Sequence, residues 1–168
     1  MLIAIAIFFS TVDVTADTIQ DQLKEISKSK PVSLIKQNSP KPLGPVEILS
    51  EGFESGVFPP YGWSLDQYNP YRTWIADTYD PHSGSYHAVC YYNDNLEYQY
   101  EMLFTPIIDL TQYTYVYLKF WWAMSYYWSV DPYDNYNFQV FVTTDKNTFT
   151  LVFDEHWIGP FNEFQWYD

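Results

Sequence analysis

The sequence predicts an all-β protein whose strands pair in an antiparallel β-sandwich over residues 46–168. Two observations lead to this prediction. The region holds short runs rich in Val, Ile, Thr, Tyr, Phe and Trp that are separated by clusters of Gly, Pro, Asn and Asp, and this is the pattern of strands and turns. It also lacks a convincing helical period, so no crossover helices are expected to join parallel strands.

Three segments carry the clearest strand patterns. Residues 113–124 and 137–143 alternate between an apolar face and a second face, and residues 149–153 repeat the alternation. Because successive side chains of a strand point to opposite faces, one face of each segment is expected in the core. A further strand is expected to end at Pro106, since proline cannot donate a hydrogen bond to a neighbouring strand.

The first 16 residues are predicted to be a signal peptide. Residues 2–9 form an unbroken apolar run that is too short to span a bilayer, and the small residues of Val14-Thr15-Ala16 follow it. No Lys or Arg follows Met1, so the usual basic start of a signal peptide is missing and an apolar strand is the alternative. We expect the mature chain to be secreted or bound to the cell surface, without a transmembrane span.

Residues 17–45 are expected to hold a short amphipathic helix followed by a Pro-rich linker. Ile19, Leu23 and Ile26 have helical spacing, and the stretch after Lys30 combines prolines with Ser, Lys and Gln. The folded domain is therefore expected over residues 46–168. The last residues begin another alternating pattern, so we expect the sequence to be a fragment of a larger protein.

The charge balance excludes one class of partner. The chain has a formal net charge of -13, and residues 46–168 contain 17 acidic residues against three basic ones. Nucleic acids are bound by Lys and Arg that displace counterions from phosphates, so a nucleic acid is not expected as a partner. Cys90 is the only cysteine; no internal disulfide can form, and packing, a metal or partner contacts must stabilise the fold.

An ordered series of motifs runs through the predicted domain. The motifs are residues 48–56 (ILSEGFESG), Pro59-Pro60 with Trp63, residues 82–86 (HSGSY) and residues 103–110 (LFTPIIDL). In this order they resemble the cleaved-adhesin and choice-of-anchor J domains, relatives of the MAM domain that occur in secreted microbial adhesins and peptidases. The resemblance implies a galactose-binding-like jelly-roll β-sandwich, a noncatalytic accessory role and a structural calcium ion. The closing strands of that family have no counterpart in this sequence.

The resemblance also indicates where calcium would bind. It implies that Glu54 supplies a side-chain ligand and that Gly52 and Gly84 supply backbone oxygens, in keeping with the oxygen ligands that calcium takes. The alternative is that Glu54 is a solvated carboxylate at a strand edge. Asp131 and Asp134 make a second oxygen-rich loop, although two aspartates in one loop more often belong to a turn.

The aromatic residues, 21% of the chain, suggest a ligand-binding site. Exposed Tyr and Trp rings stack on the apolar faces of sugars while nearby polar groups bond the hydroxyls. We predict such a site at Tyr126, Tyr127 and Trp128, which precede Asp131 and Asp134. The alternative is that these rings fill the core of the sandwich. Further candidates of the same kind are Tyr91, Tyr92, Tyr98 and Trp121.

The expected function is a noncatalytic extracellular module of a larger secreted protein, for adhesion or for binding a carbohydrate or a protein. Its partner would be an extracellular glycan or a matrix or surface protein. Two alternatives are an ancillary domain of a secreted peptidase or glycosidase whose catalytic part lies outside this sequence, and a structural surface spacer. His82, His87 and Cys90 lie close in sequence, but in a strand His87 and Cys90 point to opposite faces, so a catalytic thiol is not expected.

Overall fold

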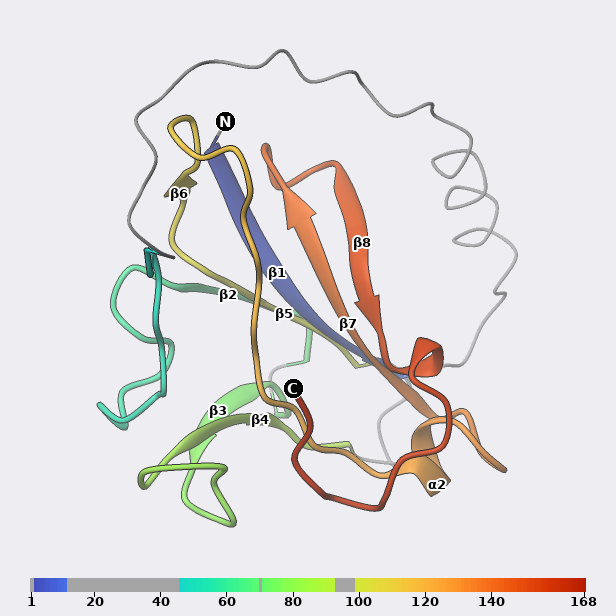
Figure 1. Ribbon diagram of the computed structural model, residues 1–168. Coiled ribbons are helices and arrows are strands. Elements are labelled where there is room, and N and C mark those ends of the chain that lie inside the picture. Colours follow the sequence, from blue (N-terminus) through green and yellow to red (C-terminus); the bar gives the residue numbers. More distant parts are fainter. Residues whose placement is uncertain (1, 12–45, 70, 93–98) are drawn as a thin grey trace. The chain divides into compact units, whose positions relative to one another are not determined.

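The computed structural model describes residues 2–11, 46–69, 71–92 and 99–168, and these residues form strands with almost no helix (Figure 1). The chain divides into two compact units, of which one comprises Met1–Val12 and Leu49–Asp168 and the other Asp13–Ile48. The predicted helix and linker at residues 17–45 lie outside the described residues, as does Tyr98.

The main sheet has six strands, all paired antiparallel. Its strand order is β2-β5-β1-β7-β8, and β6 pairs with the beginning of β1. A β-bulge shifts the register of β7 against β8 between Val140 and Phe141. The strands are β1 (Leu2–Thr11), β2 (Ser64–Gln67), β5 (Tyr100–Phe104), β6 (Ile108–Asp109), β7 (Tyr136–Thr143) and β8 (Phe149–Asp154).

A second, two-stranded sheet pairs β3 (Trp74–Asp77) with β4 (His87–Cys90), again antiparallel. The described helical elements are a single turn, α2 (Tyr126–Ser129), and a 3₁₀ turn, η1 (Glu155–Trp157). The prediction of an all-β chain with antiparallel pairing is therefore confirmed. Neither helical turn, nor any other helix in the described part of the chain, is long and apolar enough to cross a bilayer.

The N-terminal apolar run forms β1, between β5 and β7 (Figure 1). Ala6 lies opposite Phe104 on one side and Phe141 on the other. In the structure this segment is therefore a strand, which was the alternative to a signal peptide. A role of residues 1–16 in export stays a prediction, because an unbroken apolar run suits both a strand and a signal peptide.

One buried cluster joins the two sheets. Trp122 is 5% exposed and has ring neighbours in Phe138, Phe153 and Phe161, with centroids 5.0–6.4 Å away. Trp74 connects β3 to this cluster, because its ring packs edge-on against the ring of Phe138, with centroids 6.4 Å apart. Much of the aromatic content therefore packs the core. The buried members of the cluster are Trp74, Cys90, Leu103, Trp122, Met124, Tyr136 and Phe161.

Two of the three clearest strand predictions are confirmed, and the third is wrong. Residues 137–143 and 149–153 lie in β7 and β8, and β5 ends before Pro106 as expected. Residues 113–124 form no described strand, and residues 113–119 are exposed. The single pairing there is an isolated bridge in which Trp122 and Tyr167 exchange two backbone hydrogen bonds of 2.9 Å. Alternation alone does not make a strand, because a strand also needs a hydrogen-bonding neighbour.

Candidate functional site

The helical turn α2 is anchored by two serines whose side chains face inward. Ser125 Oγ accepts a hydrogen bond from the backbone N–H of Trp128 at 3.2 Å, as an N-cap does, and Ser129 Oγ donates to the carbonyl of Ser125 at 2.7 Å. Both serines are fully buried. The backbone N–H of Tyr127 donates to Glu163 Oε1 at 2.7 Å. These bonds fix α2 with Tyr127 and Trp128 exposed at the surface.

The loop after α2 folds back and adds a third ring. The N–H of Tyr133 donates to the carbonyl of Tyr127 at 3.3 Å, and the N–H of Asn135 donates to that of Trp128 at 3.0 Å. As a result the rings of Trp128 and Tyr133 stack, with centroids 4.9 Å apart and planes 21° apart. Tyr127 meets both rings edge-on, at 4.8 and 5.1 Å. We call Tyr127, Trp128 and Tyr133 the aromatic platform.

The platform is open to solvent. Its three residues are 43–44% exposed, although they pack on one another. A hydrogen bond with Tyr133 raises the pKa of the Tyr127 phenol above its ordinary value. Asp131 and Asp134 lie exposed in the same loop. The arrangement offers apolar ring surface beside carboxylate acceptors.

Two of the three predicted ligand-binding aromatics belong to the platform, and the third lies elsewhere. The structure places Tyr126 against the buried cluster, where its ring meets Phe161 edge-on at 5.0 Å. Sequence reasoning missed Tyr133. Its position between Asp131 and Asp134 was the available indication, because this loop was already predicted to be rich in oxygen ligands.

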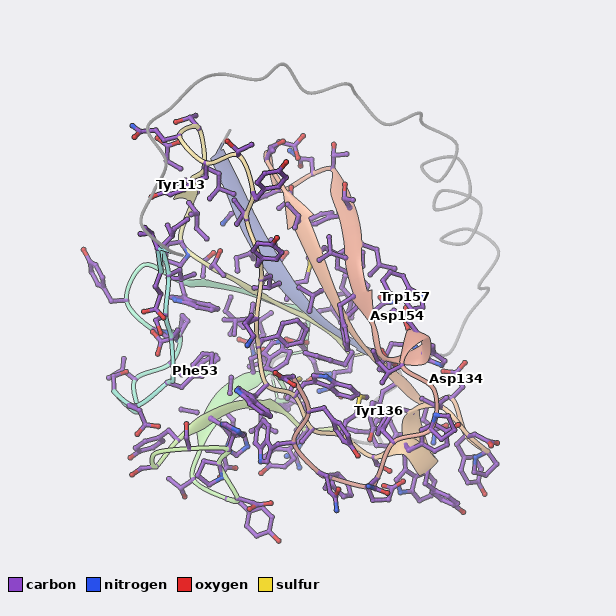
Figure 2. All side chains as sticks on the ribbon, viewed as in Figure 1. Phe53, Tyr113, Asp134, Tyr136, Asp154 and Trp157 are labelled. Carbon is purple, nitrogen blue, oxygen red and sulfur yellow. The ribbon has the colours of Figure 1, made fainter. Side chains whose placement is uncertain are left out.

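A second cluster of polar groups lies where β8 runs into η1, and Figure 2 shows Asp154, Asp134 and Trp157 at this end of the strand. Asp154 caps η1, because its Oδ1 accepts a hydrogen bond from the N–H of His156 at 2.9 Å. The imidazole Nδ1 of His156 is 3.1 Å from Asp154 Oδ1 and 3.3 Å from Glu155 Oε1. On the other edge of the ring, Nε2 is 3.7 Å from Asp134 Oδ1. No sequence motif predicts this cluster.

Glu155 is the buried member of that cluster. Its side chain is 0% exposed, and it accepts hydrogen bonds from the N–H of Phe138 at 2.9 Å and from Asn137 Nδ2 at 3.3 Å. Burial, with a smaller contribution from the charge of Asp154, raises the pKa of Glu155 to about 8. Among the described residues no Lys or Arg pairs with this carboxylate; the charge partner within reach is His156.

Of the predicted calcium ligands, Glu54 lies against the turn that contains Gly84, in a different part of the unit. Both carboxylate oxygens of Glu54 accept a hydrogen bond from the N–H of Ser85, at 3.1 and 2.9 Å, and Oε1 also accepts one from Tyr86 at 3.2 Å. Gly84 lies directly against the same carboxylate, and Gly52 lies two residues before it. The Glu54 carboxylate thus accepts hydrogen bonds from backbone N–H groups, and these bonds stabilise the turn. Calcium at this place stays a prediction.

Cys90 lies in surroundings that disfavour thiol chemistry. The residue is 8% exposed, and Gln99 Nε2 lies 3.4 Å from its sulfur. Burial raises the pKa of the thiol well above its ordinary value, and the thiolate is the nucleophilic form. The nearby histidines pack on tryptophans: His82 stacks on Trp121 at 3.9 Å, and His87 meets Trp166 edge-on at 5.7 Å.

Comparisons with known proteins add no relative to this picture. No protein-family model, no curated protein and no solved structure matches the chain. The resemblance to the cleaved-adhesin domains therefore stays a prediction, and the function has to be argued from the residues described above.

Proposed function

We propose that this chain is a noncatalytic extracellular binding module that holds a carbohydrate on the aromatic platform. The observation that carries the proposal is the stacked pair of Trp128 and Tyr133, which stays 43–44% exposed. The large aromatic side chains of a folded protein are normally buried in the core or in an interface. Three such rings that pack together at one loop leave apolar ring surface exposed, of the kind that sugar rings contact.

The polar groups beside the platform support a sugar rather than a purely apolar ligand. Asp131 and Asp134 are exposed in the platform loop, and Glu163 contacts the backbone of Tyr127. Carboxylate oxygens accept hydrogen bonds from sugar hydroxyls. The acidic balance of residues 46–168 also repels anionic glycans. Neutral or amino-bearing sugars are therefore the ligand class that we propose.

The proposal also includes the type of sandwich, the route of export and the calcium ion that the sequence predicts. The module would be a jelly-roll sandwich of the cleaved-adhesin type, and it would serve a larger secreted or surface protein. A signal peptide at residues 1–16 would export it, and its cleavage would remove β1 from the mature sheet. Antiparallel pairing in both sheets and a core that contacts both support a sandwich. A calcium ion at Glu54, Gly52 and Gly84 would further brace the turn that these residues form.

A glycan array, followed by calorimetry on the glycans that bind, tests the proposal. We expect Trp128→Ala and Tyr133→Ala each to weaken binding about fivefold or more, since each removes ring contact worth about 1 kcal/mol or more. The matched controls are Tyr115→Ala and Tyr117→Ala, whose residues are 80% and 86% exposed but lie outside the platform. Both controls should bind as the parent chain does.

Two other outcomes would contradict the carbohydrate proposal. If every glycan fails to bind but a matrix protein binds through Trp128 and Tyr133, the platform recognises a protein. If glycans and matrix proteins both fail to bind, the structural-spacer alternative gains support. Binding that persists in both platform variants would place the site elsewhere on the domain.

A further inference from the structure

The cluster at the end of β8 combines nitrogen and oxygen donors in one small volume. Ligand atoms from Asp154, Glu155 and His156 all lie within 4.8 Å of one another. His156 Nδ1 is 3.1 Å from the Asp154 oxygen and 3.3 Å from the Glu155 oxygen. Ligands about 2.0–2.2 Å from a tetrahedral zinc ion lie about 3.3–3.5 Å from one another. The Nδ1–Glu155 separation falls in this range, and the Nδ1–Asp154 separation, which is a hydrogen-bond distance, is slightly shorter.

Each of the three side chains also has an outer partner that orients it. Gln139 Nε2 donates to Asp154 Oδ2 at 2.6 Å. Asn137 and the N–H of Phe138 hold Glu155. These donors come from β7, the strand paired with β8, so the sheet itself positions the two carboxylates.

The imidazole of His156 is oriented from the opposite side. Its Nε2 faces Asp134 Oδ1 at 3.7 Å, while Nδ1 faces the other two carboxylates. Metal-binding histidines usually give one ring nitrogen to the ion and the other to a carboxylate or carbonyl. The His156 ring has this arrangement, with Asp134 as the outer carboxylate.

The burial of Glu155 is an independent indication of a cation. Its side chain is 0% exposed, and its hydrogen-bond donors, Asn137 and the backbone of Phe138, are neutral. A buried carboxylate without a Lys or Arg partner either holds a proton or is bound to a metal, because an uncompensated buried charge is strongly unfavourable. Within the described residues no Lys or Arg supplies that charge.

We infer that Asp154, Glu155 and His156 bind a divalent cation of the zinc class, and that Asp134 orients the histidine. A mixed set of one imidazole and two carboxylates suits zinc and similar borderline ions, whereas calcium takes oxygen ligands alone. Three protein ligands leave a fourth position for water or for an exogenous group. The site goes beyond the proposed carbohydrate binding and does not depend on it.

Zinc binding to the intact chain tests this inference directly. The protein is used without a histidine tag and is first freed of metal with a chelator. Calorimetry and equilibrium dialysis then measure the binding of Zn²⁺ and of Ca²⁺. We expect one saturable zinc site per chain. Bound Co²⁺ should also give the visible absorption of a tetrahedral site.

Variants separate this site from adventitious binding. His156→Gln and Asp154→Asn should each weaken zinc binding at least tenfold, and Asp134→Asn should weaken it about 10- to 100-fold without changing the stoichiometry. The matched controls are His82→Gln and Glu54→Gln, which alter a histidine and a glutamate elsewhere and should leave zinc binding unchanged. Thermal unfolding of each metal-free variant verifies that it is folded, which the 34% exposure of the His156 side chain favours.

Three results would overturn the inference. The first is the absence of saturable zinc binding in the parent chain. The second is parent-like zinc affinity in folded His156→Gln and Asp154→Asn variants. The third is calcium that displaces zinc from the Glu54→Gln variant at equal concentration, because calcium would then bind this cluster as tightly as zinc does and remove the role of the imidazole. None of these results bears on glycan binding by the aromatic platform.

Discussion

The carboxylate of Glu54 occupies the space that a β-carbon on Gly84 would fill. Gly84 has a positive φ of 67°, and the first atoms that an added β-carbon would meet are the carboxylate oxygens and the carboxyl carbon of Glu54. The carboxylate is held there by the N–H groups of Ser85 and Tyr86. One contact thus joins two segments that are about 30 residues apart in the sequence.

The first prediction concerns Gly84→Ala. The substitution adds strain at a positive φ and displaces the Glu54 carboxylate, so it should lower the free energy of unfolding by about 1–3 kcal/mol. Gly159→Ala is the matched control, because Gly159 has a φ of +77° but no atom within 4 Å of the added carbon. Urea unfolding of both variants isolates the contribution of the Glu54 contact. Equal losses in the two variants would contradict the prediction.

The second prediction concerns calcium at the same turn. If Glu54 holds calcium as the resemblance implies, added calcium should raise the melting temperature of the chain by several degrees, and a chelator should reverse the rise. Glu54→Gln should abolish the response. Differential scanning calorimetry measures it. An unchanged melting temperature in the parent chain would leave Glu54 as a brace held by N–H donors.

The third prediction uses two neighbouring tryptophans. Trp122 is 5% exposed and lies among four aromatic rings, whereas Trp121 is 50% exposed. Trp122→Ala should lower the free energy of unfolding by about 3–5 kcal/mol, because it leaves a cavity in the core. Trp121→Ala should lower it much less. A similar effect of both substitutions in urea unfolding would argue against the core described above.

The fourth prediction concerns the pH dependence of stability. Glu101 is 0% exposed, its Oε1 accepts a hydrogen bond from the N–H of Asn69 at 2.6 Å, and burial raises its pKa. The folded chain therefore holds the proton more tightly than the unfolded chain does. The stabilisation from this group is complete below the ordinary pKa near 4.5 and is lost as the pH rises through the folded pKa.

Glu101→Gln tests that dependence. The parent chain should lose stability relative to the variant as the pH rises from about 4 towards 8, and the difference between their unfolding free energies isolates Glu101 from other groups. Urea unfolding across this pH range gives the difference. A difference that does not change with pH would contradict the raised pKa of Glu101.

The parts of the fold that the sequence predicted correctly are those set by local pattern. Residues 137–143 and 149–153 alternate, and each becomes a strand because the other pairs with it. Residues 113–124 alternate just as clearly, but among the described residues they form only an isolated bridge with Tyr167 and, outside the turn at residues 110–113, one further backbone hydrogen bond, from Phe164 to Met124. Propensity and periodicity indicate whether a segment is able to form a strand. Whether a neighbouring strand is present to pair with it depends on the rest of the chain.

The candidate sites, too, were predicted where the sequence pattern is local and missed where they depend on distant contacts. Tyr127 and Trp128 were predicted because they are adjacent in sequence and lie in a loop. Tyr133 joins them through backbone hydrogen bonds that no periodicity reveals. The cluster at His156 was missed because it depends on contacts with Asp134, 22 positions earlier, and with side chains of β7.

The position of β1 has a consequence for the order of events during synthesis. β1 is the earliest described strand to leave the ribosome, yet its partners are β5 at residues 100–104 and β7 at residues 136–143. Pairings this far apart in sequence form slowly. The most apolar segment of the chain must therefore wait, unpaired, until most of the chain has been made. During that interval it is accessible to any factor that recognises nascent apolar segments, including the machinery of export.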